Sequence, residues 1–576
     1  MDITGLFLLI LVVLSRLPFL LQAGNLLDFD EATFALMAKR ILEGEIPLYV
    51  SGHSYSGSLV SFLIAPFLAL MGNTPLAVKL APLFLFLVFL SVNYVLLKKL
   101  FSRPVSIFST LFLIVMPAGV LDISLRAWGG HAELWSFGAG LLLLLSFCRD
   151  PVNSKKVIFL FWTGFLAGAA VWIGEIFILF LLPSVLYWIA PGKVKKFILV
   201  ENKSISLWLR RVFIAAHAVI GIYLAVQIAA FFLGEHGSGH PAFRIKELKK
   251  VTVFLIAEMT ALWIFTSSGG EAIRLKGKKI AAVGFGFFLG HLPAILFNVL
   301  GGEGLRIFHK SGAIAFTDFP ARLNDVFAYK IRHFVLGLSY LPGLWGWSLL
   351  ALIFVMVLVA AWHRSSPRVI LIYYGIGALT VCANIVSTLE ASRYLAPLYL
   401  AIAVILGVFL GRIAWEKSKV LSLVLALMIA AGWGYTDYRY YRDLPKGRIN
   451  DYRQILDYLD QRGIKGGQGS RSITHLLTFL SGERIVFSTY LQQERYLPHA
   501  QYTEKLWRRA YVFGKTDSAL QDLEKDPALF SKVTDKAQIG DFIVYTVEFP
   551  ENKQTGIDSS YLDWRPRPRL KFYLNQ

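Results

Sequence analysis

The chain has 576 residues, 56% of them hydrophobic, and its mean hydropathy is +0.56. Soluble globular proteins of this size are less apolar, so the composition indicates an integral membrane protein. In such a protein the formal net charge of +20 indicates orientation in the bilayer and not binding to nucleic acid.

Apolar runs long enough to cross a bilayer, which takes roughly 20 residues, recur along the chain. They lie at 80–97, 104–121, 157–174, 212–234, 280–302, 369–389 and 394–411, with shorter or interrupted runs at 3–22, 134–148, 176–192, 251–268, 344–362 and 420–436. Together they predict a helical polytopic protein of about 13 spans. The apolar segment 58–72 is shorter, and we expect it to form a re-entrant or interfacial helix.

Short connections rich in Lys and Arg alternate with connections that carry most of the acids. The positive-inside rule places the basic set in the cytoplasm of a multi-pass plasma or inner membrane protein. We expect a transmembrane domain over 1–436, with outer loops at 23–75 and 301–343. An odd number of spans then places the soluble tail, residues 437–576, outside the cytoplasm.

The tail alternates two kinds of pattern. Residues 452–462 and 473–480 have helical periodicity, whereas 484–488, 510–513 and 542–547 are short runs rich in Val, Ile, Phe and Tyr. This alternation predicts a small α/β domain.

Two adjacent acids, Asp30 and Glu31, stand at the head of an amphipathic helix expected over 31–43, along the membrane surface. Carboxylates at a membrane face cost free energy. Such a pair can bind a cation, bind sugar hydroxyls or take a proton from an acceptor. The alternative is a helix cap, because acids also stabilise the first turn of a helix.

Other candidates lie in the remaining connections. Arg126, His131 and Glu133 surround Gly129-Gly130, which lets a backbone approach a ligand closely. Arg393, followed by Tyr394, begins a late span and would either bind a phosphate or only anchor the span. His291 would touch substrate or be satisfied by a backbone carbonyl. His53 lies among hydroxyls and aromatic residues, which suit a carbohydrate or an interfacial loop.

The chain contains no Walker loop, dinucleotide fingerprint or hydrolase elbow. No metal motif has convincing spacing. The two cysteines define neither a disulfide framework nor a zinc site.

The order of these features resembles the membrane glycosyltransferases of the GT-C type. The segments DEATFALMAKRILEGEIPLY, GSLVSFLIAPFLALMG, GHLPAILFN and LTFLSGERIVF are similar to family 39, which includes protein mannosyltransferases and aminoarabinose transferases. The resemblance departs in two places. Residues 205–279 hold about two spans more than expected, and Trp128 stands where a basic residue is expected.

The resemblance implies a hexosyl or pentosyl transferase that uses a polyprenyl-phosphate sugar at the outer face of the membrane. Its acceptor would be a lipid, a glycan or a protein of the cell envelope. Asp30 or Glu31 would be the base, Arg393 would lie near the donor phosphate, and Glu133 would be a second acid. The resemblance implies no certain cofactor, and a divalent cation is compatible with such a site.

Three other functions are considered. A lipid-linked glycan ligase or oligosaccharide transferase shares the outer-face site and the lipid-linked donor. A transporter or flippase needs ionisable residues in mid-span, where only Glu258 clearly lies. A non-catalytic scaffold does not explain why acids, histidines and an arginine gather on one face.

Overall fold

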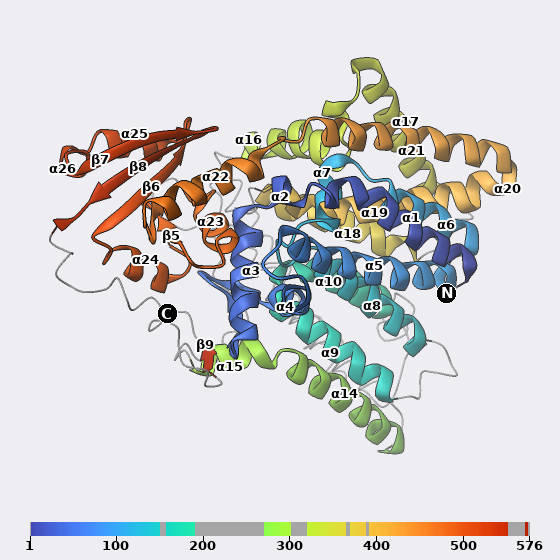
Figure 1. Ribbon diagram of the computed structural model, residues 1–576. Coiled ribbons are helices and arrows are strands. Elements are labelled where there is room, and N and C mark those ends of the chain that lie inside the picture. The colour runs from blue at the N-terminus through green and yellow to red at the C-terminus, as the bar shows by residue number, and fades with distance from the viewer. Residues whose placement is uncertain are drawn as a thin grey trace. The chain divides into compact units, whose positions relative to one another are not determined.

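The computed structural model describes residues 2–149, 157–189, 270–300, 319–363, 369–386, 391–492, 494–550 and 571–573, which are mostly helical (Figure 1). The helices are α1 (Ile3–Leu20), α2 (Ala23–Leu26), α3 (Phe29–Leu42), α4 (Leu59–Met71), α5 (Pro75–Leu100), α6 (Arg103–Ile114), α7 (Ala118–Leu121), α8 (Ala132–Arg149), α9 (Val157–Ile173), α10 (Ile178–Ile189), α14 (Gly270–Gly290), α15 (Leu292–Leu300), α16 (Phe319–Asn324), α17 (Gly343–Trp362), α18 (Ile370–Val386), α19 (Ala396–Val408), α20 (Trp415–Lys417), α21 (Lys419–Arg442), α22 (Arg448–Gln461), α23 (Thr474–Leu480), α24 (Leu497–Thr503), α25 (Ser518–Glu524) and α26 (Pro527–Phe530). Short 3-10 turns are η1 (Asp122–Ser124), η2 (Glu175–Phe177), η5 (Leu338–Tyr340) and η6 (Ser392–Leu395), and π-helical segments are η4 (Asp325–Val335) and η7 (Phe409–Ala414). The strands are β1 (Glu45–Pro47), β2 (Tyr49–Val50), β3 (His53–Gly57), β4 (Gly466–Gly469), β5 (Val486–Thr489), β6 (Arg508–Gly514), β7 (Val533–Ile539), β8 (Phe542–Glu548) and β9 (Lys571–Tyr573).

Several of the helices are long and apolar enough to cross a membrane, which confirms the predicted helical membrane fold. The described residues contain five such helices, or up to seven if each of two bent pairs counts as one span. The five are Ile3–Leu20, Pro75–Leu100, Gly343–Trp362, Ser392–Lys417 and Lys419–Arg442. Shorter apolar helices account for further predicted runs, while the runs at 212–234 and 251–268 lie outside the described residues. The predicted number of about 13 spans is therefore not reached in the part described.

The predicted run 104–121 is bent by 89° between α6 and the segment Ala118–Ser124. The break falls at Pro117, which precedes α7 with φ of −56° and ψ of 143°. A proline removes a backbone donor and disfavours a helical residue before it, so an apolar run of full length does not continue as one straight helix.

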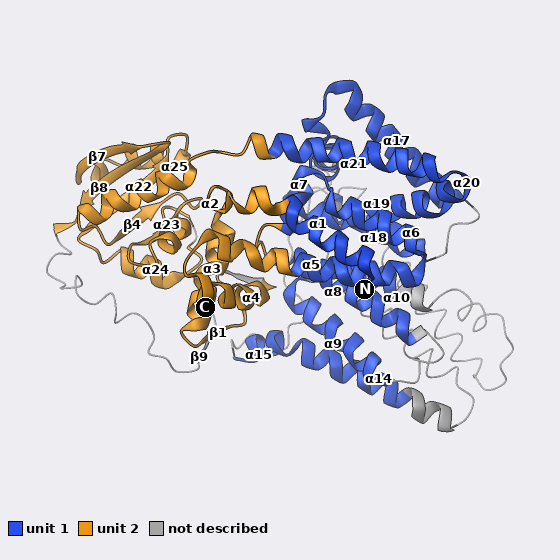
Figure 2. Ribbon diagram, turned by 45° about the vertical axis from the view of Figure 1, so that its right-hand side comes forward, with its two compact units in different colours: residues 1–15, 85–124, 130–440 blue, residues 16–84, 125–129, 441–576 orange. Residues whose placement is uncertain are grey.

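The described chain divides into two compact units (Figure 2). Unit 1 comprises 1–15, 85–124 and 130–440, and unit 2 comprises 16–84, 125–129 and 441–576. The boundary expected at 437 between a transmembrane domain and a soluble domain stays a prediction. Residues 23–75, expected to form the first outer loop, belong to the same compact unit as residues 441–576 of the tail. Of the second expected outer loop, 301–343, residues 301–318 lie outside the described part.

Helix α3 begins at Phe29, two residues before the start expected at 31. Asp28 is the N-cap, and its carboxylate accepts from the Glu31 amide at 3.0 Å, while Glu31 accepts from the Asp28 amide at 3.3 Å. This is a capping box. Ten of the 14 residues of α3 are buried, and within unit 2 the helix packs against α4 and α23. The burial is thus greater than the amphipathic pattern predicted, while the position of α3 along the membrane surface stays a prediction.

The tail holds a five-stranded sheet of order β5-β4-β6-β8-β7, in which β4 pairs in parallel with β5 and β6, while β8 is antiparallel to β6 and β7. The predicted α/β domain is confirmed, because both predicted helices and all three predicted strands are present. Strands β4 and β7 were not predicted. Strand β4 reads Gly-Gly-Gln-Gly, and a Cβ at Gly467 would collide with the backbone of Ala510 on β6.

Candidate functional site

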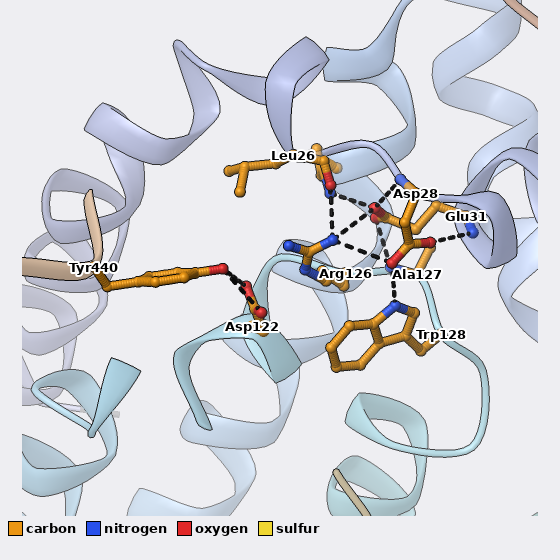
Figure 3. A network of polar contacts seen from close by, with 9 residues as sticks. Leu26, Asp28, Glu31, Asp122, Arg126, Ala127, Trp128 and Tyr440 are labelled. Atoms are coloured by element: carbon orange, nitrogen blue, oxygen red, sulfur yellow. Dashed lines mark hydrogen bonds and ion pairs between the residues drawn. The ribbon is translucent and has the colours of Figure 1, made fainter. Parts of the chain in front are cut away.

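The head of α3 contains a charge cluster, made of Asp28, Glu31, Lys79 and Arg126, in which Glu31 and Lys79 are buried and Asp28 and Arg126 are partly exposed. Figure 3 shows Asp28, Glu31 and Arg126 of this cluster with their polar contacts. Glu31 is fully buried, and its Oε2 lies 2.5 Å from Nζ of Lys79, which is itself 1% exposed. Its Oε1 accepts a hydrogen bond from the backbone amide of Ala127 at 3.0 Å. Glu31 therefore connects α3, the first turns of α5 and the segment 125–129.

Asp28 lies beside this pair. Arg126 Nη1 donates to Asp28 Oδ2 at 3.1 Å and to the Leu26 carbonyl at 2.8 Å. Trp128 Nε1 donates to the same carboxylate oxygen at 2.6 Å. The indole thus explains the departure noted in the sequence, because Trp128 supplies an N–H donor to Asp28 where a basic residue was expected.

The two adjacent acids have different surroundings. Burial raises the pKa of Glu31 to about 7, against the opposing effects of Lys79 and Arg126. Glu31 is closed off by its partners and cannot reach a substrate in this arrangement. The side chain of Asp30, by contrast, is 21% exposed and lies 2.8 Å from Nη1 of Arg495. Of the pair, only Asp30 is placed to act on a bound molecule.

Aromatic and basic groups of the tail surround the start of α3. The ring of His475 stacks on Phe29, with centroids 4.4 Å apart. The guanidinium carbons of Arg495 and Arg471 lie 4.9 and 5.2 Å from the centroid of the same ring. Asp30 follows Phe29 directly, so two cationic side chains of the tail lie close to the candidate base.

A group that could hold a metal ion lies in the tail, where ligand atoms of His475, Glu494 and His499 are within 4.8 Å of one another. His475 Nδ1 is 2.7 Å from Thr33 Oγ1, and its Nε2 is 2.9 Å from Glu494. Burial opposes ionisation of Glu494, but hydrogen bonds from His475 and from the Tyr496 amide lower its pKa to about 2. Neutral imidazoles and a carboxylate suit a divalent cation. The hydrogen bonds described above also satisfy the side chains of His475 and Glu494 without a metal ion.

The two buried histidines predict that the folded state is less stable in acid. Burial lowers the pKa of both His475 and His499 below 6.5, so the unfolded chain binds protons that the folded chain does not. Stability should therefore be lost as the pH falls below about 6.5. We expect the apparent Tm to drop between about pH 7.5 and about pH 5.5, and to drop less in His499→Gln. Equal drops in the two proteins would contradict this prediction.

The remaining predicted residues divide between the units. Arg126 joins Asp28 and Glu31 in unit 2, as described above, and His53 begins β3 there, with its side chain outside the described part. In unit 1, the rings of His131 and Tyr394 lie 5.5 Å apart. Glu133 is buried and accepts from the His131 amide at 3.1 Å.

Two further predicted residues also lie in unit 1. Arg393 lies in η6, immediately before α19, as the sequence predicted. His291 is 3% exposed, and its Nδ1 lies 3.3 Å from the Gly168 carbonyl oxygen. His291 is thus satisfied by a backbone carbonyl, which is one of the two alternatives that the sequence left open.

Sequence reasoning missed Lys79, Arg471 and Arg495. Lys79 immediately precedes the predicted run 80–97, and a lysine at that place is a detectable signal. The two arginines lie in irregular segments of the tail, more than 400 residues from α3 in sequence. No local pattern there indicates contact with α3.

No family model matches the sequence, and no curated protein matches it. Solved structures similar to it include ArnT from Cupriavidus metallidurans in the apo state, with 14% identity over 90% of this chain and 93% of that chain and a TM-score of 0.35. ArnT bound to undecaprenyl phosphate gives a TM-score of 0.36 at 14% identity, over 95% and 98% of the two chains. The Archaeoglobus fulgidus oligosaccharyltransferase in complex with Zn and sulfate gives 0.41 at 13% identity, over 89% of this chain and 68% of that chain. These are GT-C fold membrane glycosyltransferases, the kind of protein that the sequence resembles. Because the TM-scores lie below 0.5, the function proposed below rests on the residues of the site.

Proposed function

We propose that this chain is an integral membrane glycosyltransferase, which moves a sugar from a polyprenyl-phosphate donor to an acceptor of the cell envelope. The observation that carries the proposal is the pair formed by Asp30 and Arg495, a partly exposed carboxylate held 2.8 Å from a guanidinium. The pair lies in a chain with several apolar spans. The sequence resemblance to family 39 supports the choice of donor.

The proposed chemistry needs two groups. Displacing a phosphate from the anomeric carbon requires a base to take the proton from the acceptor hydroxyl. It also requires positive charge near the phosphate that leaves. Asp30 supplies the base, and arginine supplies the charge. No general acid is needed, because the phosphate leaves as an anion that is already stable.

Glu31 has a supporting role in this proposal. Glu31 forms an ion pair with Lys79 and accepts a hydrogen bond from the Ala127 amide. These two contacts hold the first turn of α3, which also carries Asp30. The Asp28 carboxylate, with Arg126 and Trp128 as donors, holds the N-cap of the same turn. The charge cluster therefore orients Asp30 without touching the substrate.

The function is tested by incubating the purified full chain with a labelled polyprenyl-phosphate sugar and cell-envelope acceptors. We expect label to move to a lipid, glycan or protein fraction and free polyprenyl phosphate to appear. Transfer only from a polyprenyl-linked oligosaccharide would favour the ligase or oligosaccharide transferase alternative. Movement of intact donor across vesicles without transfer would favour a flippase and contradict the proposal. Assays with and without a chelator show whether a divalent cation takes part.

The proposed donor and site require the tail to lie outside the cytoplasm. The basic connections and the odd number of spans expected from the sequence support this orientation. A reporter that is active only in the cytoplasm, fused after Gln576, is expected to be silent, whereas the same reporter within 149–156 should be active. Strong activity from the C-terminal fusion would place the tail on the wrong side for this reaction.

A further inference from the structure

Three consecutive residues of the tail, 494–496, contact either α3 or His475. Glu494 is hydrogen-bonded to His475, and His475 is in turn hydrogen-bonded to Thr33 of α3. Arg495 pairs with Asp30. The ring of Tyr496 lies 3.2 Å from the guanidinium carbon of Arg40. The segment that carries Arg495 is therefore anchored on both sides of this arginine.

The backbone and the aliphatic part of the Arg495 side chain are also held in place by Gly52, in the segment expected to form the first outer loop. Gly52, with φ of +75°, lies in the turn between β2 and β3, and a Cβ there would come within 2.9 Å of the Cα and Cγ of Arg495. Only a residue without a side chain leaves Arg495 where it is. The position of its guanidinium is thus set by close packing and not by the ion pair alone.

A second arginine lies close by, and no described residue gives it an acidic partner. Arg471 is partly exposed, and among the described residues its one interaction is with the ring of Phe29. Arg495 lies against the same ring. Two guanidinium groups therefore border one aromatic ring next to Asp30, and Asp30 pairs with one of them, Arg495.

We propose that Arg495 and Arg471 form a binding site for the phosphate group of a lipid-linked substrate. This inference rests on the proposed function and assigns donor recognition to the tail, in addition to the span residue Arg393. A guanidinium binds phosphate with two parallel hydrogen bonds, and two guanidinium groups can bind different oxygens of the same phosphate. When the phosphate binds, Arg495 exchanges its bond to Asp30 for bonds to the phosphate. Asp30 is then released to take the proton of the acceptor, so the base becomes available only when the donor is bound.

The direct test measures binding of polyprenyl phosphate without a sugar to the full chain in nanodiscs. We expect Arg495→Gln and Arg471→Gln each to raise the Kd by about 10- to 100-fold, the range for losing a hydrogen bond between charged groups. The matched control is Arg484→Gln, because Arg484 pairs with Asp460 at the same distance of 2.8 Å on the same domain. Polyprenol without phosphate should bind all four proteins alike.

A second pair of variants tests the position of Arg495 without removing its charge. Gly52→Ala introduces the collision with Arg495, whereas Gly44→Ala has a similar positive φ of +94° but no atom within 4 Å of its Cβ. Both substitutions strain the backbone, so the effect of Gly44→Ala on phosphate affinity measures the strain alone. We expect Gly52→Ala to lower the affinity for polyprenyl phosphate more than Gly44→Ala does, and the difference reports on the position of Arg495.

The outcomes separate this inference from the proposed function. If sugar is transferred but both arginine variants bind polyprenyl phosphate as tightly as wild type, the phosphate site is overturned and the transferase stands. If binding weakens in both variants but no sugar is transferred, the phosphate site stands and the transferase falls. An increase in the KM for a phosphorylated acceptor alone would assign the site to the acceptor phosphate and overturn its assignment to the donor. If Arg495→Gln does not fold, Arg471→Gln decides, since the ring of Phe29 is the partner of Arg471 among the residues described.

Discussion

Replacing Asp30 by asparagine is expected to lower turnover by about 10²- to 10⁴-fold, the usual contribution of a general base. Asparagine keeps the size of the side chain and can still accept a hydrogen bond from Arg495, but it does not take a proton at neutral pH. Folding should be less affected than in a variant that loses a fully buried carboxylate, because Asp30 is 21% exposed and asparagine still accepts a hydrogen bond from Arg495. The measurement is kcat with the labelled donor, together with the apparent Tm.

The matched control is Asp460→Asn, since Asp460 is also a partly exposed carboxylate paired with an arginine at 2.8 Å in the same unit. Its kcat should equal that of wild type. Near-normal turnover in Asp30→Asn would remove Asp30 from the role of base, and the buried Glu133 would be the next acid to replace.

Glu31→Gln is expected to lower the free energy of unfolding by about 3–5 kcal/mol, the cost of leaving a buried charge without its partner. Lys79 is 1% exposed, and once the carboxylate is gone its described contacts offer its charge neutral acceptors, the Leu26 carbonyl and the glutamine amide oxygen. The variant should express poorly or show a large drop in Tm in detergent. Any loss of activity should follow the fraction of folded protein, because Glu31 orients Asp30 and does not touch the substrate.

A double-mutant cycle distinguishes this structural role from a catalytic one. Combining Glu31→Gln with Lys79→Met removes both charges, and the double variant should be more stable than Glu31→Gln alone. If the two substitutions instead add independently, the ion pair does not stabilise the fold. If the stable double variant has no activity, one of the two residues acts directly in the reaction.

The sequence predicted those features of the fold that depend on residues close together in the chain. The capping of α3 depends on residues three apart, so the acids at its head predicted its start to within two residues. Strands β6 and β8 were predictable because runs of Val, Phe, Ile and Tyr form the core of the tail. Apolar runs predicted the helical membrane fold for the same reason, since burial in a bilayer depends on the composition of one segment.

The tertiary structure decided every feature that depends on residues distant in sequence. Asp30 and Glu31 are neighbours with the same chemistry, yet one pairs with Arg495 and the other is buried with Lys79. Strand β4 has a composition unfavourable for a strand, and it exists because its glycines allow the strands on either side to approach. Consecutive residues of a helix point in different directions, so the partners that the fold supplies determine which carboxylate remains available for chemistry.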